Sequence, residues 1–294
     1  MRKFMLIAVA VGALVGAGAS LHAQDENANM PPKVLMIQRE TVKFGKDAAH
    51  EKNEAAFART FAAMKSPEHY LAATTQSGDD EAVFFVGYDS FAAWGEDQKT
   101  SNEPKMQALL QPLQEKDGDY VSDGRQVVAT LNDKWSYHPQ VDIGKQHYFE
   151  IETVRLRAGH DKDWDDLIDL YKATATKINL DESAVFYQVR YGAPEGTVLI
   201  FIPRTSMADI DTALGNDKAF QSALGDEGQK KWAQLIAASV ESGRVDLLAV
   251  DPEMSYPMDS WVKADPDFWK PKAAAKAAPK TGGRAPAKEP AGGK

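Results

Sequence analysis

The sequence reads ETVKFG at residues 40–45 and ETVRLRAG at residues 152–159. Each stretch ends an apolar run rich in β-branched residues at a glycine, which is typical of a strand followed by a turn. Further similarities follow in the same order along the chain: Gly78 with Gly192, residues 83–86 (VFFV) with 199–202 (LIFI), and Gly124-Arg125 with Gly243-Arg244. An ordered series of this kind predicts a tandem repeat of one structural unit.

Both copies are expected to have the same order of elements. The first copy is predicted to hold strands at 34–44, 70–76, 81–88 and 126–131, with helices over 46–64 and from Pro104. The second copy is predicted to hold strands at 148–156, 184–191, 197–202 and 245–250, with helices from 160 and over 207–214 and 229–240. Helical periodicity predicts two inward stripes: Met106, Leu109, Leu110 and Leu113, then Trp232, Leu235, Ile236 and Val240. The order β-α-β-β-α-β is the ferredoxin-like unit. We therefore expect an α+β protein with tandem ferredoxin-like modules at residues 33–140 and 146–256.

The two ends of the chain have other compositions. Arg2 and Lys3 precede an uncharged apolar run, and a small residue, Ala23, follows it. This pattern predicts a signal peptide over residues 1–23 and a periplasmic or secreted protein. The apolar run is shorter than the ~20 residues of a membrane anchor, which is the alternative. Residues 270–294 are mostly Ala, Pro, Gly and Lys, and we expect a disordered basic tail.

The amino-acid composition excludes several kinds of site and partner. The chain contains no cysteine, so disulfides, thiol catalysis and thiolate metal ligands are excluded. The net charge is −9 although both ends are basic, so the negative charge is concentrated in the body. An acidic body argues against nucleic acid as a partner of the folded part and is compatible with neutral or cationic small molecules.

The predicted strands, the repeat and the exit from the first strand of the second unit (TVRLRAGH, residues 153–160) resemble the dimeric α+β barrel superfamily. Within it the chain is similar to antibiotic-biosynthesis-monooxygenase-like and NIPSNAP-like domains, over both predicted modules. The resemblance implies two sheets packed face to face as a barrel, here an intramolecular pseudo-dimer. That superfamily includes cofactor-free oxygenases, haem-handling enzymes, isomerases and proteins without known activity, and none of its site motifs is recognisable in this chain.

Glu40 and Glu152 are the candidate catalytic residues, because they occupy equivalent positions in the two first strands. Strand alternation places Glu40 on the face of Val42 and Glu152 on the face of Val154. A carboxylate directed into an apolar barrel would have a raised pKa and could act as a general base. The alternative is a strand-end carboxylate that faces solvent or pairs with a neighbouring cation.

The histidines predict no metal site. His50 and His160 both follow the glycine after the first strand, but at different distances, and we expect helix-start surface residues. No pair has HxH or HExxH spacing, so neither a metal nor another cofactor is predicted. Asp161, Asp163 and Asp165 resemble the opening of a calcium loop, but the required glycine is absent and the helix dipole accounts for these acids.

The second unit carries the larger side chains. Phe186 and Tyr187 correspond to Ala72 and Ala73 of the first unit. Together with Trp164 and Arg190, these aromatics are the candidate ligand-binding residues, unless they only fill space against smaller partners. Three functions remain open: binding of a small apolar or aromatic ligand between the sheets, a cofactor-independent monooxygenase or isomerase with a glutamate base, and a non-catalytic envelope-associated structural protein.

Overall fold

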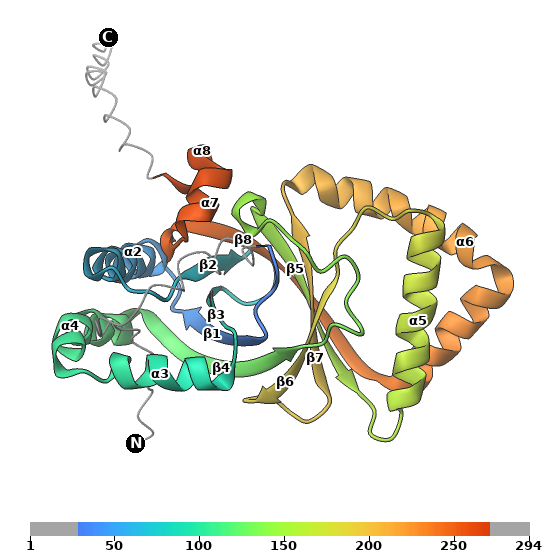
Figure 1. The fold of residues 1–294 in the computed structure, drawn as a ribbon, viewed down its shortest axis with the longest axis horizontal. Coiled ribbons are helices and arrows are strands. Elements are labelled where there is room, and N and C mark those ends of the chain that lie inside the picture. The colour runs from blue at the N-terminus through green and yellow to red at the C-terminus, as the bar shows by residue number, and fades with distance from the viewer. Residues whose placement is uncertain (1–28, 271–294) are drawn as a thin grey trace, which may run out of the picture.

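The computed structural model describes residues 29–270, so the predicted signal peptide and nearly all of the predicted tail lie outside the described residues. The described part is an α+β fold with a closed antiparallel barrel in the strand order β1-β3-β2-β8-β5-β7-β6-β4 (Figure 1). The strands are β1 (Val34–Val42), β2 (Tyr70–Thr75), β3 (Glu81–Tyr88), β4 (Val121–Leu131), β5 (Tyr148–Leu156), β6 (Val185–Tyr191), β7 (Thr197–Arg204) and β8 (Val240–Tyr256).

Each half of the chain contributes four neighbouring strands with the ferredoxin-like order. The first half runs β4-β1-β3-β2 and the second β8-β5-β7-β6. The barrel closes where β2 pairs with β8 and where β4 pairs with β6. Pairing between the halves satisfies the backbone groups that would otherwise line four open sheet edges, those of β2, β4, β6 and β8.

Helices cover the barrel from two opposite sides. Figure 1 shows α2 and α4 beside the strands of the first half and α5 and α6 beside those of the second. The helices are α2 (Asp47–Met64), α3 (Phe91–Ser101), α4 (Pro104–Tyr120), α5 (Asp161–Lys177), α6 (Met207–Ser239), α7 (Asp259–Ala264) and α8 (Pro266–Trp269), with a 3₁₀ turn η1 at Ile143–Lys145. Among them, none combines the length and the apolar character needed to span a membrane.

Strand alternation creates three separate cores. All eight strands contribute to the barrel interior, for example Leu35 and Ile37 from β1 and Tyr187 from β6. The alternate residues of the same strands, such as Val34 and Met36, pack instead beneath the helices of their own half. A strand side chain therefore lies either in the barrel interior or in one of two helix-covered layers.

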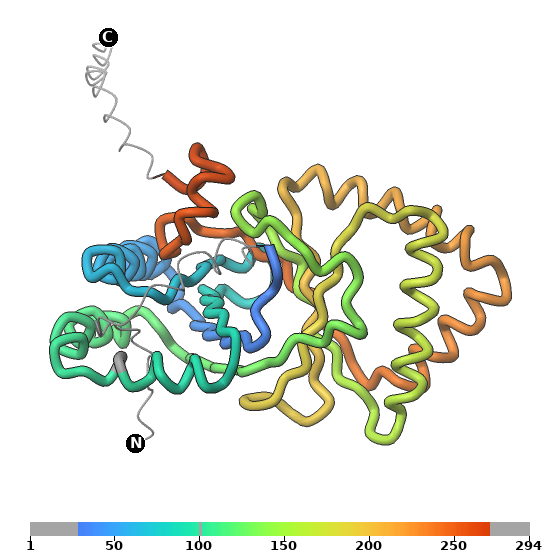
Figure 2. The backbone as a smooth tube through the Cα atoms, viewed as in Figure 1, coloured from blue at the N-terminus to red at the C-terminus, as the bar shows by residue number. Residues whose placement is uncertain are grey.

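The two helices expected after β7, at 207–214 and 229–240, both lie within α6. They stand on either side of Gly225, whose φ of +65° is not helical and which separates α6 into two helical parts. Figure 2 shows the α6 tube changing direction along its length. The two inward stripes were partly wrong, because Leu109 is 45% and Ile236 38% exposed. A helix that bends, or that contacts its neighbours over only part of its length, buries a narrower face than periodicity predicts.

Candidate functional site

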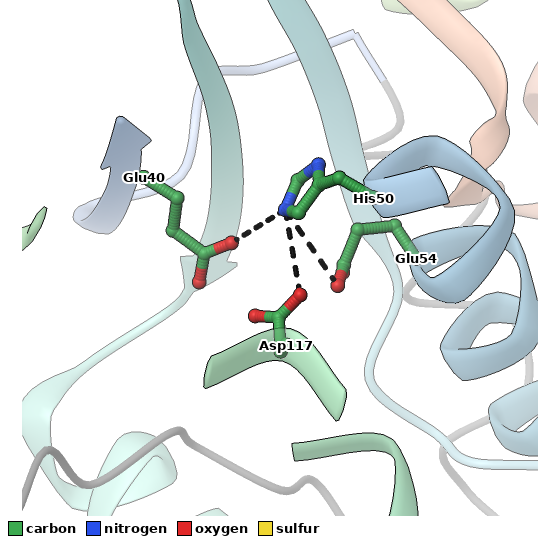
Figure 3. A group of neighbouring side chains, drawn as sticks. All are labelled: Glu40, His50, Glu54 and Asp117. Carbon is green, nitrogen blue, oxygen red and sulfur yellow. Dashed lines mark hydrogen bonds and ion pairs between the residues drawn. The ribbon is translucent and has the colours of Figure 1, made fainter. Parts of the chain in front are cut away.

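Four polar side chains meet in the buried layer between the first-half strands and their helices. Glu40 comes from β1, His50 and Glu54 from α2, and Asp117 from α4 (Figure 3). Each side chain is at most 6% exposed. His50 Nε2 lies 3.1 Å from Glu40 Oε2, 3.5 Å from Asp117 Oδ1 and 4.0 Å from Glu54 Oε1. We call these four residues the buried cluster.

Local structure explains why these residues converge. Glu40 shares its strand face with Met36 and Val42, which pack beneath the helices. His50 and Glu54 are four residues apart in α2, so they lie on one helix face. Asp117 lies in the last turn of α4, and its carbonyl accepts the amide N–H of Val121 where β4 begins.

Neighbouring amides hold two of the carboxylates in place. Gln38 Nε2 donates to Glu40 Oε1 at 3.5 Å, along the same strand face. Asn53 Nδ2 lies 3.4 Å from Asp117 Oδ1 and also donates to the carbonyl of Leu113 at 3.0 Å. Such outer contacts fix the orientation of carboxylates in binding sites.

The buried cluster concentrates negative charge. Burial, with the charges of Glu40 and Asp117, raises the pKa of Glu54 well above its usual value. Burial and the charge of Glu40 likewise raise the pKa of Asp117 to about 6. His50 is the one basic partner that these carboxylates have within residues 29–270, and Glu54 Oε1 is a buried oxygen without a hydrogen-bond partner.

The second half shows that the fold does not require polar residues here. His50 and Glu54 stand five and nine residues after Gly45, and the same steps from Gly159 lead to Trp164 and Ile168. Both are buried in the apolar core beneath α5 and α6. Burying charged groups costs free energy that apolar side chains do not incur. The acidic residues of the first half therefore indicate a function rather than a packing need.

The donor atoms have the spacing of a metal site. The imidazole nitrogen and one oxygen of each carboxylate all lie within 4.8 Å of one another, and in the described part of the chain this is the one such group of three or more donors. Ligands that lie ~2.1 Å from an ion are about 3 to 4 Å apart in tetrahedral or octahedral sites. One imidazole and three carboxylates could therefore hold a divalent ion.

The predicted glutamates are not directed into the barrel. Glu40 faces the helix layer, where it contacts His50. Glu152 has the corresponding orientation, because its neighbours Ile151 and Val154 lie in the barrel interior and beneath the helices, respectively. Burial raises the pKa of Glu152. The expected raised pKa is present at Glu152, but the expected barrel location was wrong for both glutamates. The two positions are not equivalent either, because Glu40 is the seventh residue of β1 and Glu152 the fifth of β5.

The four predicted ligand-binding residues do not converge on one site. Trp164 and Phe186 pack together beneath the second-half helices, with ring centroids 6.3 Å apart. Tyr187 points to the opposite face, into the barrel, and its hydroxyl donates to the carbonyl of Pro32 at 2.9 Å. Arg190 is exposed and donates to Thr130 and Gln188. Alternation along β6 separates Phe186 from Tyr187.

The prediction that His50 lies on the surface was wrong, since its side chain is 2% exposed. The useful signal was the spacing of His50 and Glu54, which places two metal donors on one helix face although it matches no HExxH motif. Asp117 gave no signal of its own, because it lies 77 and 63 residues away from Glu40 and Glu54 in the chain.

Comparisons with known proteins show the fold alone. No protein-family model matches the sequence, and no curated protein matches it. A solved anthrone oxidase-like protein shares 12% identity with a TM-score of 0.50, covering 74% of this chain and 91% of that one. A candidate monooxygenase from Fusobacterium nucleatum shares 11% identity, with a TM-score of 0.49 and coverages of 75% and 93%. A variant chlorite dismutase from Candidatus Nitrospira defluvii shares 10% identity with a TM-score of 0.47, and the match covers 82% of this chain and 99% of that one.

Proposed function

We propose that the protein binds one divalent metal ion in the buried cluster. The observation that carries the proposal is the convergence of three buried carboxylates and one imidazole within 4.8 Å. A bound cation would compensate the negative charge that burial makes costly and would give Glu54 Oε1 a partner. The donor set is oxygen-rich and lacks sulfur, which suits Mn²⁺, Fe²⁺, Co²⁺ or Zn²⁺ better than Cu⁺.

Chelator-treated protein titrated with Mn²⁺, Co²⁺ and Zn²⁺ tests this proposal. We expect one ion per chain, and bound Co²⁺ gives visible absorption that reports its ligands. Glu54→Gln and Asp117→Asn should weaken binding at least about tenfold, because each removes a charged ligand. Glu152→Gln, a matched strand glutamate of the second half, should bind the ion like the original protein. Equal affinity in all variants, or no stoichiometric ion, would contradict the proposal.

A divalent ion at this site would supply Lewis-acid chemistry. The buried cluster would hold the ion, and Gln38 and Asn53 would orient two of its carboxylate ligands, Glu40 and Asp117. The expected alternative, a cofactor-independent monooxygenase or isomerase with Glu40 or Glu152 as base, predicts activity that a chelator leaves unchanged.

Binding of an apolar or aromatic ligand between the sheets is the second candidate. It is supported by the aromatic side chains of the barrel interior, where Phe85 and Tyr187 both contact Phe201. Mass spectrometry of the native protein, purified without organic solvent, checks this candidate. A mass equal to that of the chain and its metal alone would argue against a retained apolar ligand.

The remaining proposals concern origin and location. We propose that the halves arose by tandem duplication and form an intramolecular pseudo-dimer, which the equal strand orders support. We also propose that Ala23 precedes the cleavage site and that the protein acts in the periplasm or outside the cell. The intact mass of the exported protein tests the cleavage. Deletion of residues 270–294 tests whether the basic tail mediates the envelope association of the third predicted function.

A further inference from the structure

Two buried polar atoms of α3, outside the buried cluster, have no hydrogen-bond partner. They are the indole nitrogen Nε1 of Trp94 and the carboxylate oxygen Oδ1 of Asp97. Buried polar groups of folded proteins are almost always hydrogen-bonded, so unpartnered donors and acceptors in one region indicate a bound polar molecule or water.

Tyr88, the last residue of β3, connects the two α3 residues. Its hydroxyl donates to Asp97 Oδ2 at 2.8 Å. Its ring lies 6.3 Å from the ring of Trp94, measured between centroids. Trp94 and Asp97 are three residues apart in α3, so they share one helix face. The unpartnered indole N–H and the unpartnered carboxylate oxygen therefore flank the same tyrosine.

Glu68 brings a second carboxyl group to this place. Glu68 stands two residues before β2, whose first residue Tyr70 pairs with Val86, and Tyr88 follows Val86 by two residues at the end of β3. Burial and the charges of Asp97 and Asp89 raise the pKa of Glu68 to about 7. Burial also raises the pKa of Asp97 to about 6. Neither carboxyl has a Lys or Arg ion-pair partner in the part of the chain that the structure describes.

The chemistry of these groups favours an organic cation. Two carboxyl groups call for a positive charge, and the rings of Trp94 and Tyr88 attract a weakly hydrated cation. The site lacks the three clustered donors of a metal site, which in the described residues occur only in the buried cluster. The indole N–H is a donor, so the ligand also needs an acceptor such as a hydroxyl.

We propose that Glu68, Tyr88, Trp94 and Asp97 form a second site, the α3 site, which binds a short amino alcohol. The ammonium group donates to Asp97 Oδ1 and to Glu68, and the hydroxyl accepts the indole N–H of Trp94. Glu68 is only half-buried, so it lies on the side from which solvent and ligand reach the site. The α3 site does not depend on the metal, because it shares no residue with the buried cluster.

Calorimetric titration of the full chain with ethanolamine at pH 8 tests the α3 site. We expect saturable binding with a dissociation constant on the order of 1 mM, as suits so small a ligand. Propylamine, which lacks the hydroxyl, should bind more weakly, and ethylene glycol, which lacks the ammonium group, should not bind. Absence of saturable ethanolamine binding, or equal binding of ethylene glycol, would overturn the proposal.

Variants assign the binding to these side chains. Asp97→Asn and Glu68→Gln keep the shape of each side chain and should weaken ethanolamine binding at least about tenfold and severalfold, respectively. Trp94→Phe should abolish the preference for ethanolamine over propylamine. Asp217→Asn, at an exposed carboxyl of α6, should bind ethanolamine unchanged. If both Asp97→Asn and Glu68→Gln fold normally by circular dichroism and retain full affinity, the proposal is wrong.

Discussion

Glu40 and His50 are ten residues apart in the chain, and their side chains meet at 3.1 Å in the buried layer beneath α2. The turn between β1 and α2 reverses the chain so that the helix lies over the strand from which it came. The same turn in the second half brings Trp164 over β5. The layer between the first strand and its helix therefore contains polar side chains in the first half and apolar side chains in the second.

The first prediction concerns the stability cost of the buried cluster. Glu54→Leu should raise the free energy of unfolding of the metal-free protein by about 1 to 4 kcal/mol, because it replaces a buried carboxyl with an apolar side chain of similar volume. Denaturant unfolding in the presence of a chelator measures this change. Glu115→Leu, at an exposed position of the neighbouring α4, should change the value by less than about 0.5 kcal/mol. A loss of stability in Glu54→Leu would show that Glu54 is structural.

The second prediction concerns metal removal. An ion that binds only the folded chain stabilises it by about 2.7 kcal/mol when its free concentration is one hundred times its dissociation constant. Thermal unfolding should therefore shift to higher temperature with added ion and return when a chelator is added. His50→Asn should abolish this shift, whereas Glu152→Gln should show it in full. A shift of equal size in His50→Asn would place the ion elsewhere.

The third prediction concerns pH and follows from Glu68 and Asp97, whose pKa values are about 7 and about 6 in the folded protein. In the unfolded chain both carboxyls titrate near pH 4. Between about pH 4 and pH 7 the folded state therefore holds more protons, so the stability that these two groups contribute falls as pH rises. It should level off above pH 7.

Denaturant unfolding between pH 4 and pH 8, in buffers free of amines, measures this pH dependence. A double variant, Glu68→Gln with Asp97→Asn, should make the fall of stability between pH 5 and pH 7 less steep, because neither amide titrates, while Asp117 still contributes to the slope. Asp217→Asn should leave the curve unchanged. A rise of stability with pH that the double variant removes would contradict the assignment.

The fourth prediction concerns Tyr187. Its buried hydroxyl donates to the Pro32 carbonyl, so Tyr187→Phe should lower the free energy of unfolding by about 1 kcal/mol. Tyr191→Phe is the matched control, since Tyr191 lies on the same strand and is 63% exposed. Metal binding should be unaffected in both variants. An unchanged stability in Tyr187→Phe would leave the hydroxyl free for the ligand role that the sequence suggested.

The order and type of the elements were predictable because they depend on local patterns. Alternation gave β3 (Glu81–Tyr88) and β5 (Tyr148–Leu156) with the observed bounds. At the start of α3, Ser90 Oγ accepts the amide N–H of Ala93, as is usual for a serine that caps a helix. The α+β class followed from these elements. Burial of individual helix residues was less predictable, as Leu109 and Ile236 show, because burial depends on what lies opposite the helix.

The sequence by itself determined that Glu40 shares a strand face with Val42, that Glu152 shares one with Val154, and that His50 and Glu54 share a helix face. These statements follow from fixed periods of two residues in a strand and 3.6 in a helix. Only the tertiary structure decided that Glu40 lies under α2 rather than in the barrel, and that Asp117 completes the buried cluster from α4. Alternation alone cannot tell which strand face the helices cover. That choice, and contacts between distant segments, depend on how the whole chain packs its apolar surfaces.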